Sequence, residues 1–150
     1  HATGWKIGYC LAPAEITKEF RKIHQFVNFT VSTPFQMALA DYLKWNFEFC
    51  DQLGSFYQAK RDYFCSLLSK SRFHVRPSQG TYFQLLDYSN ISGELDVTLS
   101  KEWTRKLGIA SIHISVFYTK QPSSPQALLR FCFAKDDATL EKAGEILCRI

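Results

Sequence analysis

The sequence predicts an α/β protein, because segments with helical periodicity alternate with short runs of β-branched and aromatic residues. From about Phe73 onward, strand-like runs and helices are interleaved closely enough to predict an α+β layer of a few strands covered by helices. With 150 residues, of which 46% are hydrophobic, the chain can bury a core of ordinary size.

The first predicted element is a strand over residues 7–11, closed by Pro13 and preceded by a loop that contains Lys6. This strand has no obvious partner nearby in the sequence, and a lone strand is poorly stable. We therefore expect residues 3–11 to belong to a larger sheet whose other strands lie outside this chain.

Helices are predicted next. Apolar residues recur at steps of three and four over residues 14–26. Thr33 suits the N-cap of another helix, and Pro34 suits its first helical position. The pattern stays mostly helical from residue 35 to residue 71, and Gly54 interrupts it. We therefore expect two helices or one helix bent at Gly54.

The second half changes period repeatedly. Asp96 and Asp137 are predicted to cap helices, and Gly108 to end the first of them. The other expected elements are an extended segment over 73–77, a turn over 78–80, strands over 81–88, 109–118 and 127–134, a helix over 97–107 and a loop over 120–125.

Composition argues against several classes of protein. The net charge of +4 is small and its basic residues are scattered, so we expect no nucleic-acid partner. No apolar run is long enough to span a membrane. Five widely spaced cysteines form no zinc or redox motif, which predicts free thiols in a cytoplasmic protein, with Cys10 and Cys132 buried in strands.

Two basic residues, Lys6 and Arg130, lie in sequence surroundings that favour binding of an anion. Lys6 lies between Gly4 and Gly8, where glycine permits positive φ or close approach of a ligand to the backbone, although a solvated lysine at a strand entry fits equally. Arg130 interrupts an apolar strand without an acidic neighbour. Its partner is either a structural carboxylate from elsewhere or the carboxylate of a ligand, which a guanidinium can bind with two parallel hydrogen bonds.

Other candidates are less specific. Tyr82 and Phe83 alternate across their strand, so one of the two faces the core. His24 and His113 could act as bases, but neither has a carboxylate nearby in sequence, so we interpret both as structural. Phe29 and Thr30 lie in an ordinary connection between helices.

Several stretches together resemble class I/II aminotransferases that use pyridoxal phosphate, and most of all the methionine and kynurenine aminotransferase subgroup. The resemblance covers nearly the whole chain and is carried by residues 1–9 (HATGWKIGY), 24–36 (HQFVNFTVSTPFQ), 79–89 (QGTYFQLLDYS) and 129–135 (LRFCFAK). It implies the C-terminal portion of a fold-type-I transferase. The end of the large domain would span 1–33, connecting helices 34–72 and the small α+β domain 73–150.

The resemblance also implies roles for individual residues. Lys6 would bind the phosphate of pyridoxal phosphate, and Arg130 would bind the α-carboxylate of the substrate. Tyr82 would lie near the substrate side chain, while Phe29 and Thr30 would reach across the interface of a homodimer and help to bind the substrate in the neighbouring active site. The lysine that forms a Schiff base with the cofactor would lie just before His1, outside this chain. His113 departs from the subgroup, which often has proline there.

The implied reaction is transfer of an amino group from an apolar or aromatic amino acid, such as methionine or kynurenine, to a 2-oxo acid. Without the Schiff-base lysine, this chain alone is predicted to be inactive. Two alternatives remain: a cysteine-conjugate β-lyase on the same scaffold, or a non-catalytic α/β domain that binds a carboxylate ligand through Arg130.

Overall fold

The computed structural model describes residues 2–120 and 126–150, so most of the predicted loop over 120–125 lies outside the described residues. The chain forms two compact units, His1–Asp51 and Gln52–Ile150, and each is described here by itself. The domain boundaries implied by the resemblance stay a prediction.

The N-terminal unit is helical. It contains the 3-10 turn η1 (Thr3–Trp5), helix α1 (Ala14–Val27) and helix α2 (Thr33–Trp45), which confirms the helix predicted over residues 14–26. Ser32, not Thr33, occupies the N-cap position of α2, so Pro34 lies one residue later than predicted. The Trp5 ring stacks on Phe35, with 4.8 Å between ring centroids, and so joins η1 to the start of α2.

The strand predicted over residues 7–11 is wrong for the structure described. These residues are irregular, and most of them are exposed. An isolated apolar run cannot form a strand without a partner for its backbone hydrogen bonds, and the described residues of this unit include no other strand. The expectation of a larger sheet outside the chain stays a prediction.

The break in the long helical run occurs at Asn46, and the predicted interruption at Gly54 is wrong. Helix α3 (Phe47–Leu67) continues through Gly54, because one glycine costs a helix only about 1 kcal/mol. Asn46 adopts φ −132° and ψ 34°, outside the helical region. Its side-chain amide donates to the carbonyl of Tyr42 at 3.1 Å, which competes with continuation of the helix.

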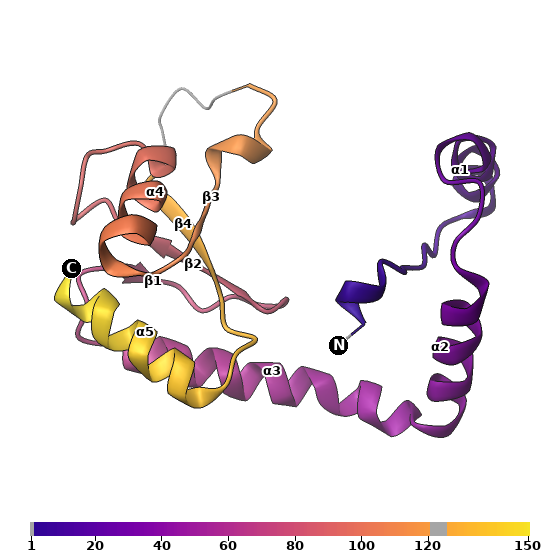
Figure 1. Ribbon diagram of the computed structural model, residues 1–150, viewed down its shortest axis with the longest axis horizontal. Coiled ribbons are helices and arrows are strands. Elements are labelled where there is room, and N and C mark those ends of the chain that lie inside the picture. The colour runs from indigo at the N-terminus through magenta and orange to yellow at the C-terminus, as the bar shows by residue number, and fades with distance from the viewer. Residues whose placement is uncertain (1, 121–125) are drawn as a thin grey trace. The chain divides into compact units, whose positions relative to one another are not determined.

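The C-terminal unit is built on a four-stranded antiparallel sheet in the order β1-β2-β4-β3 (Figure 1). The strands are β1 (His74–Val75), β2 (Phe83–Asp87), β3 (Ile112–His113) and β4 (Leu128–Cys132). Helices α4 (Asp96–Leu107) and α5 (Asp137–Arg149) complete the unit together with the C-terminal part of α3.

One face of this sheet carries the core. The paired residues Leu86 and Leu129, and likewise Gln84 and Phe131, are all buried. The core cluster adds residues of all three helices: Phe64 and Leu68 of α3, Leu99 and Trp103 of α4, and Leu140 and Leu147 of α5. The opposite face carries Leu85 and Arg130, which pair with each other and are less buried. Arg130 therefore lies on the face without a covering helix in this unit.

Several predicted boundaries shift. The strand expected over 109–118 is only two residues long, and residues Ser115–Phe117 form the 3-10 turn η2 instead. Gly108 ends α4 with φ 69°, as predicted. Asp136, not Asp137, caps α5 by accepting a hydrogen bond from the Thr139 amide. Asp96 is the first residue of α4, not its N-cap, and its carboxylate accepts hydrogen bonds from Val97 in α4 and from Ser115 in η2.

All five cysteines are free, as predicted, but Cys10 is exposed and Cys132 is only half-buried. Both were expected to lie in buried strands. Within the part of the chain that the structure describes, no group of histidine, cysteine or acidic residues could hold a metal ion. In the same part, none of the helices is both long enough and apolar enough to cross a membrane.

Candidate functional site

Arg130 occupies the middle of the less covered sheet face. Its cross-strand partners are Leu85 on β2 and Ile112 on β3, so apolar side chains flank the cation on both sides. The strand alternates in burial, which turns Leu129 and Phe131 toward the helices and leaves Arg130 half-buried on the other face. The sheet therefore presents one positive charge in an apolar setting.

The guanidinium of Arg130 has aromatic neighbours and, in the part of the chain that the structure describes, forms no ion pair with a carboxylate. Its Cζ lies 4.2 Å from the ring centroid of Phe83 and 5.2 Å from that of Phe117. Among the described residues, no salt bridge reaches it, and its buried Nε has no hydrogen-bond partner. A buried donor of this kind costs free energy until it is paired, so the geometry favours a ligand that brings an acceptor.

A small cavity of about 120 Å³ adjoins Arg130. It is lined by Phe83, Ala110, Ser111, Ile112, Arg130 and Cys132. This volume suits one carboxylate or a few water molecules. An unpaired guanidinium beside such a cavity can bind a carboxylate through charge-assisted hydrogen bonds, which are the strong ones.

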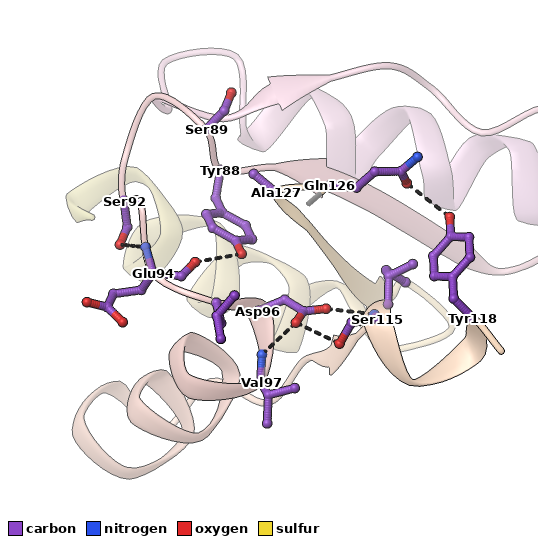
Figure 2. A pocket seen from close by; sticks show the side chains of 13 residues that line it. Tyr88, Ser89, Ser92, Glu94, Asp96, Val97, Ser115, Tyr118, Gln126 and Ala127 are labelled. Atoms are coloured by element: carbon purple, nitrogen blue, oxygen red, sulfur yellow. Dashed lines mark hydrogen bonds between the residues drawn. The ribbon is translucent and has the colours of Figure 1, made fainter. Parts of the chain in front are cut away.

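Phe117 reaches Arg130 from η2, which Asp96 holds in place. The Asp96 carboxylate, 5% exposed as a residue, accepts hydrogen bonds from the Ser115 amide at 2.7 Å and from the Ser115 hydroxyl at 2.8 Å (Figure 2). It also accepts from the Val97 amide at 2.8 Å, in the first turn of α4. Burial alone would raise the pKa of Asp96, but the hydrogen bonds from Ser115, Val97 and Ile114 outweigh it and lower that pKa.

The cavity drawn in Figure 2 has a volume of about 610 Å³ and lies beside this network. Its polar groups are largely bonded to one another: the Tyr88 hydroxyl donates to the Glu94 carbonyl at 3.0 Å, and the Tyr118 hydroxyl to Gln126 at 3.1 Å. Since these groups already have partners, we interpret the hydrogen bonds as holding the loops around α4 together.

Tyr82 lies beside a separate cavity of about 420 Å³ that is lined by residues of α3 and of the segment before β2. Its ring centroid is 6.0 Å from that of Tyr57 and 4.3 Å from that of Phe83. Tyr82 is half-buried, and of the predicted pair it is Phe83 that contacts Arg130. Tyr82 therefore lies near Arg130 but does not contact it in the same way, because the Phe83 ring contacts both residues.

Lys6, Phe29 and Thr30 lie in the N-terminal unit, so their positions are described without reference to Arg130. Lys6 is exposed and forms no salt bridge within the described part of the chain. It takes φ 56° itself, whereas Gly4 and Gly8 do not adopt positive φ and have no atom near an added Cβ. Neither glycine therefore takes the positive φ that was one of the two predicted roles, and the other role, close approach of a ligand to this backbone, stays a prediction.

Phe29 is 82% exposed and adopts φ 61°, which is uncommon for a bulky side chain. It follows the end of α1, where the His24 carbonyl accepts from the amides of both Asn28 and Phe29. Thr30 is exposed beside it. The strained backbone presents the Phe29 ring outward from this unit.

Sequence reasoning missed Phe83 and Phe117 as neighbours of Arg130. Phe83 pairs with Cys132, two residues along β4 from Arg130, so the register of the strands could have indicated it. Phe117 had no such signal, because residues 115–117 were predicted as strand and form a 3-10 turn.

The fold and the site define an α+β unit whose sheet carries a half-buried arginine that forms no salt bridge among the described residues. The family model of aminotransferase class I and II matches residues 1–147, and the chain belongs to this family.

Named relatives agree with this assignment. A methionine aminotransferase of Escherichia coli (strain K12) is 46% identical over 147 residues, which cover 98% of this chain and 38% of that protein. A kynurenine–oxoglutarate transaminase of Dictyostelium discoideum is 33% identical over 174 residues, covering 99% of this chain and 38% of that protein. The chain thus spans about 38% of the length of these curated relatives.

Solved structures confirm the fold class. A crystal structure of an Escherichia coli protein with a methionine aminotransferase function matches with a TM-score of 0.85 and 46% identity, over 99% of this chain and 39% of that one. The N-succinyldiaminopimelate aminotransferase of Mycobacterium tuberculosis matches with a TM-score of 0.84 and 32% identity, over 99% of this chain and 38% of that one. The chain has the fold of part of a fold-type-I aminotransferase.

Proposed function

We propose that the full-length protein containing this chain is a pyridoxal-phosphate-dependent aminotransferase. It transfers the amino group of an apolar or aromatic amino acid, such as methionine or kynurenine, to a 2-oxo acid. The observation that carries this proposal is Arg130, a half-buried cation without a carboxylate partner in the described chain, held between two aromatic rings beside a small cavity.

Arg130 binds the α-carboxylate of the substrate in this proposal. Its planar guanidinium can donate two parallel hydrogen bonds to one carboxylate, which orients the amino acid as well as binding it. The rings of Phe83 and Phe117 lie over the guanidinium and attract its positive charge, which holds it in place for the carboxylate. Tyr82 adds an aromatic surface nearby that suits an apolar or aromatic side chain.

Lys6 is the residue of this chain that would bind the cofactor phosphate. Its ammonium is exposed and is not paired with a carboxylate in the described structure, so it can accept an anion. Pyridoxal phosphate, when bound, supplies the electron sink that the reaction at the α-carbon requires. We place the Schiff-base lysine before His1, and we therefore expect residues 1–150 alone to be inactive.

We also propose a homodimer in the cytoplasm. Support for the dimer comes from Phe29, whose exposed ring and strained backbone suit a residue that contacts a second subunit, with Thr30 beside it. Support for the cytoplasm comes from the five free cysteines, since thiols stay reduced there.

An absorption spectrum of the purified full-length protein tests the function. We expect a visible cofactor band that changes when L-methionine is added, together with formation of the corresponding 2-oxo acid when a 2-oxo acid acceptor is supplied. Release of pyruvate from a cysteine conjugate in place of amino transfer would indicate the β-lyase. A colourless protein that binds a carboxylate and stays unchanged with added pyridoxal phosphate would indicate the binding domain.

A further inference from the structure

We infer that Asp96 is a positioning residue for substrate binding. Acting through Ser115, it fixes turn η2 so that Phe117 lies over the guanidinium of Arg130. The inference rests on the function proposed above for Arg130. It adds two residues, Asp96 and Phe117, that determine how firmly the substrate carboxylate is bound.

The first link joins α4 to η2. Asp96 begins α4, and both of its carboxylate oxygens accept hydrogen bonds from Ser115, the first residue of η2, at 2.7 Å and 2.8 Å (Figure 2). The Val97 amide donates to the same carboxylate from within α4. One buried side chain thus ties the backbone of two elements together, and charge-assisted hydrogen bonds make this tie firm.

The second link joins η2 to Arg130. Phe117 is the last residue of this short turn, two positions after Ser115, so fixing Ser115 limits where its ring can lie. The ring centroid is 5.2 Å from Arg130 Cζ, although 61% of the Phe117 residue is exposed. The Phe117 amide donates to the Ile114 carbonyl at 3.0 Å within the turn, and the hydrogen bonds of Asp96 tie that turn to α4.

The third link is energetic. No carboxylate in the described chain pairs with Arg130, so the rings of Phe83 and Phe117 are what orient its guanidinium. A cation placed over an aromatic face is attracted to it, and the attraction increases as water is excluded. A guanidinium held in one orientation loses less freedom when it binds a carboxylate, and the affinity is therefore higher.

The test measures binding of 4-(methylthio)butanoate, which is methionine without its amino group, to the purified full-length protein by calorimetry. We expect Asp96→Asn and Phe117→Leu each to raise the dissociation constant by on the order of two- to tenfold. Because Asp96 acts through Phe117, the double variant should bind no more weakly than Phe117→Leu alone. Phe117→Tyr keeps the ring and should retain the affinity of the parent protein.

Asp136→Asn is the matched control. Asp136 also accepts a backbone hydrogen bond at the start of a helix, from the Thr139 amide at 2.8 Å, but it caps α5, and no hydrogen bond among the described residues joins it to η2. We expect it to lower thermal stability without changing affinity for the carboxylate. If Asp96→Asn does not fold, Ser115→Ala removes only the hydrogen bond from the Ser115 hydroxyl to Asp96. This variant should also raise the dissociation constant of the carboxylate.

The inference is overturned if the parent protein does not bind the carboxylate, if Asp96→Asn binds it normally, or if the effects of Asp96→Asn and Phe117→Leu multiply. The proposed function fails separately: a protein that binds the carboxylate with this pattern but neither takes up pyridoxal phosphate nor transfers amino groups would refute the aminotransferase and leave the role of Asp96 standing. Normal amino transfer, together with increases in the dissociation constant that multiply in the double variant, would support the aminotransferase and refute the role of Asp96.

Discussion

The half-buried guanidinium of Arg130 is oriented by two aromatic rings, whereas proteins often pair such a buried cation with a carboxylate. A carboxylate partner would neutralise the cation and compete with a substrate, whereas Phe83 and Phe117 orient the guanidinium and leave its charge in place. The sequence indicated that Arg130 needs a partner from another segment. It could not identify Phe117, because that contact depends on a 3-10 turn over residues 115–117 that was predicted as strand.

Replacing Arg130 by lysine keeps the charge but removes the planar fork that binds both carboxylate oxygens. We expect kcat/KM for methionine to fall roughly 10- to 100-fold in the full-length enzyme, since about 1.5–3 kcal/mol is typical of a hydrogen bond to a charged group. Transfer from 3-(methylthio)propylamine, which lacks the carboxylate, should change much less.

Arg105→Lys is the control for this substitution, because Arg105 is exposed on α4, away from the cavity beside Arg130. It should leave both rates unchanged. An Arg130→Lys enzyme that loses activity equally with the amino acid and the amine would contradict the assigned role.

Helices α3 and α5 meet at a glycine. An added Cβ at Gly144 of α5 would lie 2.9 Å from the Cβ of Leu67 in α3, too close for two such atoms. The atom it meets belongs to the root of the Leu67 side chain, so a rotamer change cannot move it away. Gly144 is therefore required by the packing of these two helices, whereas Gly54, inside α3, meets nothing within 4 Å.

The two glycines should respond in opposite ways to alanine. We expect Gly144→Ala to destabilise the protein by about 1–3 kcal/mol, because the helices must separate to admit the methyl group. Gly54→Ala should stabilise it by about 0.5–1 kcal/mol, since alanine favours the helix and nothing obstructs it. Urea unfolding of the two variants measures both effects. Equal effects at the two positions would contradict the packing described.

Elements that depend on local pattern could be predicted, and those that depend on distant partners could not. Helix α1 follows from the spacing of its apolar residues, and the end of α4 follows from Gly108. Residues 7–11 look like a strand, but strand formation requires hydrogen-bonding partners that the described unit does not provide. The break at Asn46 was missed because a polar residue inside a helical run is a weaker signal than glycine.

Three carboxylates connect the stability of the whole molecule to pH. Burial would raise the pKa values of Asp87 and Asp96, but hydrogen bonds, chiefly from Ser89 and Ser115 respectively, outweigh it and lower both. The Thr139 amide lowers the pKa of Asp136. Each group binds fewer protons in the folded state than in the unfolded state, so its contribution is present at neutral pH and is lost as the pH falls.

Acid should therefore destabilise the protein. We expect the thermal midpoint to drop as the pH falls below about 4, the ordinary pKa of an aspartate in an unfolded chain. Asp96→Asn should have a lower midpoint at pH 7 and a smaller further loss in acid, because its carboxylate no longer titrates. Circular dichroism melts between pH 3 and pH 7 measure this, and an unchanged acid dependence in Asp96→Asn would contradict it.

Positive φ angles occur at three non-glycine residues of the described chain: Lys6, Phe29 and Thr81. Lys6 is proposed to bind the cofactor and Phe29 to contact a second subunit, and Thr81 precedes Tyr82. Left-handed backbone at such residues costs of order 1 kcal/mol or more, and glycine would relieve the strain. A saturation-mutagenesis survey that scores abundance and activity separately should therefore find glycine tolerated or beneficial for abundance at these positions and harmful for activity. Such opposed scores would locate functional residues from sequence variants alone.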